Sequence, residues 1–114
     1  MLDTNLKHLE TKAQYDESTG AGAKAVVICG RMGPMCLPVY DIAEGLESKY
    51  PDVRFFDMDY DDPVASDTIL RLPEVRGFQG LPFTVYFRDG KVVAATSSIQ
   101  DKQQVKAILD SKMK

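Results

Sequence analysis

A continuous apolar segment that runs straight into a glycine- and proline-containing break is the feature that most constrains the fold. Residues 25–29 are Ala-Val-Val-Ile-Cys, a composition typical of a strand that is buried on both faces. Residues 30–34 contain two glycines and Pro34, which interrupt a strand. Pro34 suits the first turn of a helix, because its missing N–H is not needed there. The sequence therefore predicts a buried strand that leads directly into a helix.

The other segments continue this alternation of strands and helices. Further strands are predicted at residues 6–9, 53–60, 82–87 and 91–96, and helices at residues 10–18, 34–50, 63–72 and 102–113. Glu10 or Thr11, then Asp62 and Asp101, are the expected helix caps, and Pro38 is expected to bend the second helix. The order β-α-β-α-β-α-β-β-α predicts an α/β fold, with a central mixed sheet of about five strands and helices on both faces. We expect one domain, residues 1–114.

Composition and charge exclude several classes of function. The 114 residues carry a formal net charge of -3, and the basic residues are scattered, so we expect no nucleic-acid partner. No segment has the length of a membrane span, and the first residues contain no apolar signal core, so we expect a cytoplasmic protein with no membrane partner. We further expect a monomer without a cofactor. The lone histidine, His8, is expected on the surface.

The last third of the chain resembles the thioredoxin family. Residues 83–96, Phe-Thr-Val-Tyr-Phe-Arg-Asp-Gly-Lys-Val-Val-Ala-Ala-Thr, match the family's strand, tight turn and return strand, and residues 75–78, Val-Arg-Gly-Phe, match the sequence that precedes its cis-proline. Three residues, Gln79-Gly80-Leu81, are inserted before Pro82, which is the expected cis-proline. The resemblance extends over nearly the whole chain. It implies a thioredoxin-like fold and a groove beside Pro82 in which an extended protein segment pairs with the backbone.

The active-site motif of that family is not intact here. Thioredoxins have Trp-Cys-Gly-Pro-Cys, and two alignments are open. If Gly33-Pro34 matches the family's Gly-Pro, then Met32 and Met35 replace both cysteines and Arg31 replaces the tryptophan. If the alignment is counted back from Tyr50, Cys36 takes the place of the second cysteine and Gly33 that of the first. The family's buried aspartate is also missing, because Val26 or Val27 stands there. Asp57 is a candidate replacement, although an ordinary carboxylate at a strand edge or end is the favoured interpretation.

The two cysteines of the chain flank this motif. Cys36 is expected in the first turn of the helix, where free N–H groups and the helix dipole stabilise a thiolate, and Arg31 adds positive charge. Cys29 ends the preceding strand, and a strand end can approach the helix that it leads into closely enough for a disulfide. We therefore predict Cys36 as a catalytic residue, alone or paired with Cys29. A buried, inert thiol is the competing interpretation of Cys29.

Two functions follow from the resemblance, and a third from the sulfur atoms. The first is an atypical protein-disulfide oxidoreductase whose partners are protein disulfides or dithiols and a reductase. The second is a protein-binding module that has kept the fold and lost the redox chemistry. For the oxidoreductase, the predicted substrate-binding residues surround the motif and the proline: Arg31, Met32, Gly33, Pro34, Met35, Leu81 and Pro82. For the binding module, the expected exposed contact patch around Pro82 consists of Arg31, Met32, Met35, Leu81 and Phe83. Four sulfurs, from Cys29, Met32, Met35 and Cys36, would also suit Cu(I), but we expect the methionines to form a hydrophobic rim and no metal to bind.

Overall fold

The strands of the protein form one mixed sheet. The computed structural model describes residues 2–78 and 80–113, and within them five strands lie in the order β1-β3-β2-β4-β5. The strands are β1 (Lys7–His8), β2 (Lys24–Gly30), β3 (Arg54–Asp59), β4 (Phe83–Arg88) and β5 (Lys91–Ser97). β3 is parallel to both β1 and β2, whereas β4 is antiparallel to β2 and to β5. The predicted α/β fold with a central mixed sheet is confirmed.

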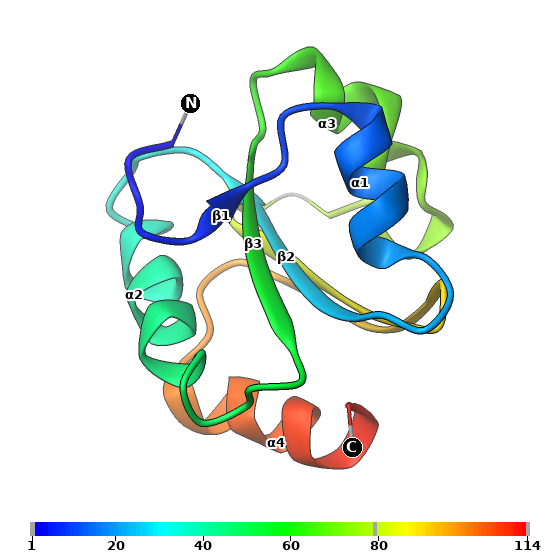
Figure 1. Cartoon of the computed structure of the whole chain (residues 1–114). Coiled ribbons are helices and arrows are strands. Elements are labelled where there is room, and N and C mark those ends of the chain that lie inside the picture. The colour runs from blue at the N-terminus through cyan, green and yellow to red at the C-terminus, as the bar shows by residue number, and fades with distance from the viewer. Residues whose placement is uncertain (1, 79, 114) are drawn as a thin grey trace.

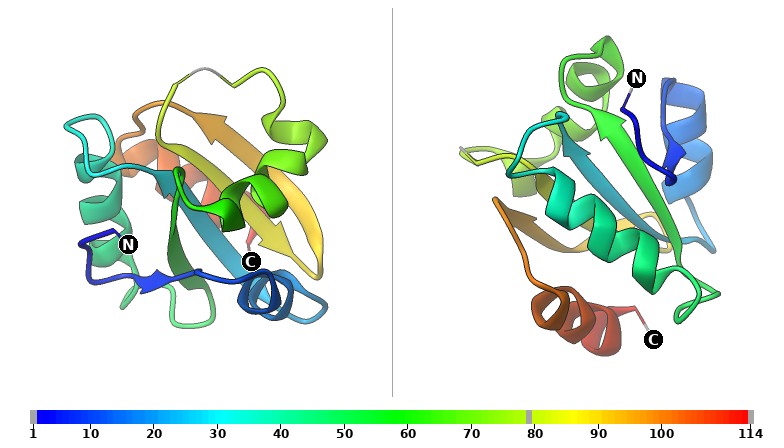
Figure 2. Two further views of the ribbon diagram at one scale, coloured as in Figure 1. Left: turned by 90° about the horizontal axis from the view of Figure 1, so that it is seen from above. Right: turned by 90° about the vertical axis from the view of Figure 1, so that its left-hand side faces the viewer.

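Helices cover both faces of this sheet (Figures 1 and 2). They are α1 (Lys12–Thr19), α2 (Leu37–Leu46), α3 (Pro63–Asp67) and α4 (Lys102–Lys112), with short 3-10 turns at Ile69–Arg71 and Pro73–Val75. Side chains of α2 and α4 pack with Val26 and Ile28 of β2 on one face. Side chains of α1 and α3 pack with Ala25, Val27 and Cys29 on the other. Successive residues of a strand point to opposite faces, so β2 supplies both cores and is buried throughout.

Local capping signals placed the starts of α1, α3 and α4 correctly. Thr11, Asp62 and Asp101 each accept a backbone N–H at the start of a helix, as predicted. Two of the predicted helices are shorter than expected. α2 begins at Leu37 instead of residue 34, so Pro38 lies in its first turn and disrupts no interior hydrogen bond. The third helix ends at Asp67, and Thr68 leaves the helical region with φ -128° and ψ -89°.

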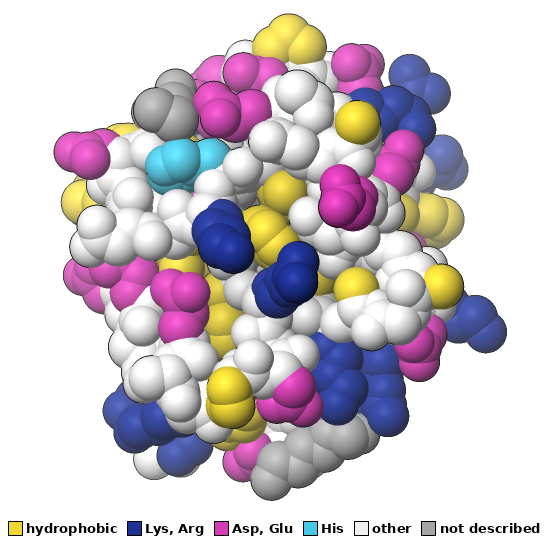
Figure 3. Space-filling view, viewed as in Figure 1, with side chains coloured by type: hydrophobic (Ala, Val, Ile, Leu, Met, Phe, Trp, Pro, Cys, Tyr) yellow, Lys and Arg dark blue, Asp and Glu magenta, His cyan; other side chains and the backbone are white. Residues whose placement is uncertain are grey.

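The surface carries charges of both signs. Figure 3 shows acidic and basic side chains interspersed over one face of the molecule, with hydrophobic side chains exposed between them. Within the described residues, no helix combines the length and the apolar content that crossing a bilayer requires. Gln79, the first residue of the insertion before Pro82, lies outside the described residues.

Candidate functional site

Cys36 lies at the junction between the loop after β2 and helix α2. It is the N-cap residue of α2 and is 3% exposed. The backbone N–H of Arg31 donates to its Sγ over 3.4 Å. The amides of Cys36 and Leu37 both donate to the carbonyl of Gly33, at 3.0 and 3.1 Å, so residues 33–37 form a tight turn above the thiol. The thiol is therefore held in place by the loop that contains the Gly-Pro pair.

Three side chains converge on the Cα of Gly30, at the end of β2. A Cβ added to Gly30 would lie 2.9 Å from Cys36 Sγ, 2.8 Å from Tyr40 Oη and 3.0 Å from Pro82 Cβ. Pro82 is buried and follows a cis peptide bond with Leu81. The Tyr40 hydroxyl donates to the carbonyl of Arg31 over 3.1 Å. A thiol, a phenol and a proline thus meet at one point, and only glycine leaves room for them.

Cys29 lies on the other face of the sheet. Its side chain packs in the core under α1 and α3, whereas Cys36 packs in the core under α2 and α4. Both cysteines are free and buried. Burial raises the pKa of the Cys29 thiol, and the carboxylate of Asp59 raises it further, so this thiol stays protonated at neutral pH. The structure therefore does not bring together the two cysteines that the sequence suggested as a pair.

The loop between Gly30 and Cys36 is anchored by one arginine. The guanidinium of Arg31 makes two hydrogen bonds to the carboxylate of Asp61, at 2.8 and 2.9 Å, and lies 5.1 Å from the centre of the Tyr60 ring. The Arg31 hydrogen bond and charge hold the pKa of the Asp61 carboxyl below its usual range. This pair is solvent-exposed, with 55% and 57% of the two side chains accessible, so its contribution to stability is small. Its effect is to fix the position of the loop.

The rest of the loop is exposed. Met32 and Met35 are 43% and 48% exposed, and Leu37 next to them is 39% exposed. Pro34 is also exposed, and a Cβ added to Gly33 would meet no atom within 4 Å. The N–H of Asp3 donates to Met32 Sδ over 3.3 Å. Because Cys29 faces the opposite core from Cys36, the four sulfurs do not form one cluster, and no group of His, Cys, Asp or Glu within the described residues has a metal-binding arrangement.

A small cavity lies between this loop and the segment before Pro82. Its volume is about 210 Å³, and it is lined by Arg31, Tyr60, Leu70, Val75, Phe78, Gly80, Leu81 and Phe83. The rings of Tyr60 and Phe78 both contact the ring of Phe83, with centroids 6.4 and 6.2 Å apart. Two of the predicted partner-binding residues, Arg31 and Leu81, therefore border the same aromatic cavity. Phe83 is 2% exposed, so the prediction that it belongs to an exposed contact patch was wrong.

Asp57 is a buried carboxylate on the face of the sheet that carries Cys36. It is 1% exposed in the middle of β3, which excludes the favoured interpretation of a carboxylate at a strand edge or end. It accepts a hydrogen bond from the Thr4 hydroxyl, and His8 Nδ1 lies 2.6 Å from its Oδ1. Burial raises the pKa of Asp57, and these two neighbours oppose the shift. The His8 side chain keeps 23% of its surface exposed, so the predicted surface histidine lies at the surface with its Nδ1 turned toward a buried carboxylate.

Tyr40 connects these groups and was missed by the sequence reasoning. Burial raises the pKa of its phenol, and the Cys36 sulfur and the Asp57 carboxylate raise it further. The hydroxyl therefore stays protonated and acts as a donor. Its position four residues after Cys36, on the same helical face, is the signal that could have identified it. Nothing local in the sequence indicates that Gly30 and Pro82 would meet the same two side chains.

Comparisons with known proteins agree with this architecture. No protein-family model and no curated protein matches the sequence. Among solved structures, thioredoxin O2 from Arabidopsis thaliana in its oxidized state superposes with a TM-score of 0.76 and 19% identity, over 99% of this chain and 98% of that one. Plasmodium falciparum thioredoxin superposes with a TM-score of 0.74 and 15% identity, over 94% of this chain and 99% of that one. Oxidized mitochondrial thioredoxin 3 from Saccharomyces cerevisiae superposes with a TM-score of 0.71 and 21% identity, over 92% of this chain and 94% of that one.

These likenesses extend over almost the whole of each chain, and they are structural. At identities of this size they establish the arrangement of helices and strands, and they leave the chemistry of the site to be argued from its own residues. Methionines flank Gly33-Pro34, and the only cysteines are Cys29 and Cys36. The protein therefore has a thioredoxin-like fold that lacks an intact Cys-Gly-Pro-Cys motif.

Proposed function

We propose that the protein carries out thiol–disulfide exchange with protein disulfides or dithiols, with Cys36 as the reacting thiol and a thiol reductant or reductase as second partner. The observation that carries the proposal is the position of Cys36. Its Sγ accepts the Arg31 N–H at the start of α2, and it contacts the same glycine as Pro82. Thiolates are the species that attack disulfides, and this sulfur lies beside the groove-forming proline and the exposed loop.

The reaction proceeds by two exchanges. The Cys36 thiolate attacks one sulfur of a partner disulfide, an S–S bond forms between Cys36 and that sulfur, and the other sulfur leaves as a thiolate. A second thiolate, supplied by the reductant, then attacks the partner's sulfur and releases Cys36. Cys29 takes no part, because its thiol is buried in the opposite core and stays protonated. An internal Cys29–Cys36 disulfide would require one side chain to cross the sheet.

The loop must open before Cys36 can react. The thiol is 3% exposed, so a partner sulfur cannot reach it while the turn at residues 33–37 is closed. Gly33 has open space around its Cα, and Pro34 and Met35 are exposed. These three residues can therefore move without disturbing the core. Arg31 anchors the start of the loop to Asp61 and would remain in place.

The exposed residues around the loop form the proposed partner-binding surface. Met32 and Met35 supply flexible apolar contacts, and Arg31 and Leu81 border the aromatic cavity. A segment of the partner would lie along Leu81 and Pro82 and place one apolar or aromatic side chain in the cavity. A volume of about 210 Å³ accommodates a single side chain and not a larger ligand.

Single cysteine variants test the proposal. The Cys36→Ser and Cys29→Ser variants and the wild-type protein are each incubated with a disulfide-containing peptide, and covalent adducts are measured by mass spectrometry. We expect an adduct with the wild-type protein and with Cys29→Ser, and none with Cys36→Ser. Release of the adduct by an added thiol completes the cycle. An adduct that survives Cys36→Ser, or no adduct with any of the three, refutes the proposal.

A binding module without redox chemistry is the second candidate. The burial of Cys36 and the exposed methionines on either side of Gly33-Pro34 favour it. The two candidates differ in what Cys36→Ser does to a partner captured through this surface. A binding module keeps its affinity in that variant and loses it in a Met32→Gln, Met35→Gln double variant. If the protein acts by thiol exchange, the Cys36→Ser variant forms no covalent complex, and this loss does not depend on whether Met32 and Met35 are also replaced.

A further inference from the structure

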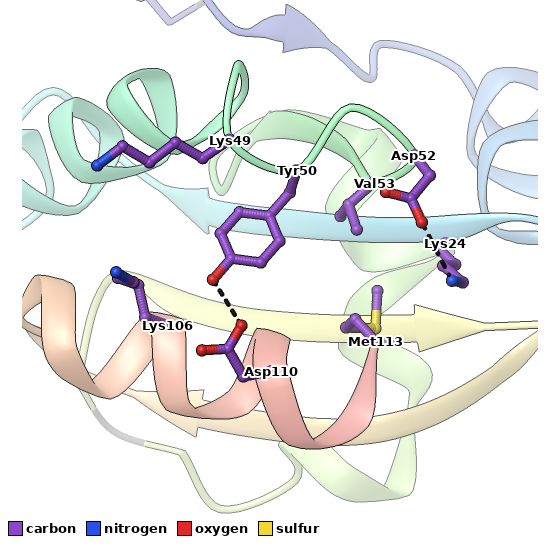
Figure 4. A pocket seen from close by; sticks show the side chains of 8 residues that line it. All are labelled: Lys24, Lys49, Tyr50, Asp52, Val53, Lys106, Asp110 and Met113. Carbon is purple, nitrogen blue, oxygen red and sulfur yellow. Dashed lines mark hydrogen bonds and ion pairs between the residues drawn. The ribbon is translucent and has the colours of Figure 1, made fainter.

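A second cleft lies at the end of α2 that is remote from Cys36. It has a volume of about 530 Å³ and is formed by the segment after α2, the start of β2 and one side of α4 (Figure 4). Its lining residues are Lys24, Lys49, Tyr50, Asp52, Val53, Lys106, Asp110 and Met113. α2 separates it from Cys36 by the length of ten residues, about 15 Å. A ligand in this cleft would therefore leave the thiol site unobstructed.

Lys49 and Lys106 line one end of this cleft, and Lys102, an exposed residue outside the lining, lies next to them. The nearby ammonium group of Lys102 lowers the pKa of Lys49. Lys106 follows Lys102 by one helical turn on the same face of α4 and is half-buried. Figure 4 shows the nitrogens of Lys49 and Lys106 at the same end of the cleft. Ammonium groups repel one another at such distances, so this end of the cleft favours an anion.

Each acidic residue of the cleft has a hydrogen-bonding or ionic partner within it. The Tyr50 hydroxyl donates to Asp110 Oδ1 over 2.7 Å. Asp52 lies at the other end, where its Oδ2 is 3.3 Å from the ammonium of Lys24. Figure 4 shows the two interactions side by side along the cleft. Lys24 and Asp52 thus pair at one end of the cleft, whereas Lys49, Lys102 and Lys106 lie toward the other end, where the Asp110 carboxylate, one helical turn from Lys106, is hydrogen-bonded to Tyr50.

The floor of the cleft is apolar. Val53 and Met113 are 5% and 1% exposed, and the ring of Tyr50 lies beside them (Figure 4). Small-molecule sites commonly combine such an apolar surface with a few charged groups that fix orientation, in volumes of about 300–1,000 Å³. The cleft has both properties. It suits a ligand with a charged group and an apolar body.

We infer that this cleft binds a small phosphate monoester, with its phosphate between Lys49, Lys102 and Lys106 and its apolar part against Val53 and Met113. A phosphate monoester carries a charge of about -2 near neutral pH and three acceptor oxygens. That number of acceptors matches three ammonium donors, and the charge offsets the repulsion between them. A carboxylate offers less charge and fewer acceptors. The inference stands independently of the proposed chemistry at Cys36.

Phenyl phosphate is the probe that tests this inference. It is titrated into the isotope-labelled full chain, and the backbone amide resonances of residues 49–53 and 102–113 are followed by NMR at constant ionic strength. We expect shifts that saturate and are confined to this cleft, and weaker binding of methyl phosphate, which lacks the apolar body. The double variant Lys49→Gln, Lys106→Gln should lower the affinity by about tenfold. Lys12→Gln, which removes an exposed lysine of α1 paired with Asp16, should leave it unchanged.

Several results would overturn the inference. They are shifts that do not saturate, shifts that sodium chloride reproduces at equal ionic strength, and an equal loss of affinity in Lys12→Gln. If the double variant fails to fold, the single variant Lys102→Gln replaces it, because that side chain is exposed. The same titration on Cys36→Ser should give the wild-type affinity. Failure of the phosphate site and failure of the thiol chemistry are thus observed separately.

Discussion

Replacing Gly30 by alanine should destabilise the protein through three contacts at the candidate site. The added Cβ would lie 2.8 Å from Tyr40 Oη, 2.9 Å from Cys36 Sγ and 3.0 Å from Pro82 Cβ. All three distances are shorter than van der Waals contact, and the three side chains are buried. The Tyr40 hydroxyl is held by its hydrogen bond to the Arg31 carbonyl, and the proline ring is rigid. The methyl group therefore cannot be accommodated without moving the loop or the helix.

The magnitude follows from two opposing effects. Overpacking of a buried site costs about 1–3 kcal/mol, and three simultaneous contacts place this site in the upper half of that range. Glycine-to-alanine replacement also restricts the unfolded chain, which stabilises the native state by about 0.4–1 kcal/mol. The net loss is then about 2 kcal/mol. At about 4 °C per kcal/mol for a domain near this size, the midpoint of thermal unfolding should fall by about 8 °C.

Urea unfolding of Gly30→Ala measures this loss, and Gly45→Ala is the matched control. Gly45 lies within α2, and a Cβ there would meet no atom within 4 Å. That substitution should raise stability by about 0.5–1 kcal/mol, because alanine is the better helix former. The two glycine substitutions are thus expected to have opposite signs. A loss below about 0.5 kcal/mol for Gly30→Ala would refute the reasoning.

A double-mutant cycle with Cys36→Ala locates the cause. Removing Sγ eliminates one of the three close contacts and leaves those with Tyr40 and Pro82. The cost of Gly30→Ala should fall by about 0.5–1 kcal/mol in the Cys36→Ala background. If the cost is the same in both backgrounds, the thiol does not lie against Gly30 as the structure shows.

Three further outcomes are expected. Burial raises the pKa of Asp57 in the folded state. Between the unfolded pKa of about 3.9 and this raised pKa, the native state binds more protons than the unfolded chain. The contribution of Asp57 to the free energy of unfolding is therefore present at low pH and is lost as the pH rises through that range. Urea midpoints measured across this pH range should therefore fall relative to those of Asp57→Asn, and a relative rise would contradict the assignment. Arg31→Ala should accelerate alkylation of Cys36 by iodoacetamide, because it removes the contact with Asp61 that holds the loop. Lys12→Ala, which breaks another exposed pair, should leave the alkylation rate unchanged. Asp101→Ala should cost about 1 kcal/mol through loss of the cap of α4, while Gln103→Ala on the exposed face should be neutral in the same unfolding assay.

The starts of α1, α3 and α4 and the central strand could be predicted because they depend on neighbouring residues. Thr11, Asp62 and Asp101 bond to amides two or three residues away, and the apolar segment before Gly30 is long enough to identify a buried strand. The helix lengths were less predictable. Thr68 donates to the Val64 carbonyl at the point where α3 ends, and the Gly33 carbonyl accepts the amides that delay the start of α2. Hydrogen bonds of this kind compete with helical geometry and leave the hydrophobic pattern unchanged.

The side chains that surround each cysteine sulfur could not be predicted from the sequence. Strand alternation shows that Cys29 and Ile28 face opposite ways, but it does not say which face α2 covers. Packing decides that α2 lies on the face of Ile28, which separates Cys36 from Cys29. The contact of Asp57 with His8 likewise depends on β1 lying beside β3. Two residues of edge strand are too short a segment to reveal that pairing by periodicity.

The sequence by itself determined the α/β order, the caps and the displacement of both cysteines from the Gly-Pro pair. These are properties of single residues and their near neighbours. Only the tertiary structure decided that Cys36, Tyr40 and Pro82 meet at Gly30 and that Cys29 does not join them. The physical reason is distance along the chain: Pro82 is more than fifty positions from Gly30, and the closing of such a contact depends on how β2, α2 and β4 pack together. No local pattern of hydrophobicity or turn residues encodes that packing.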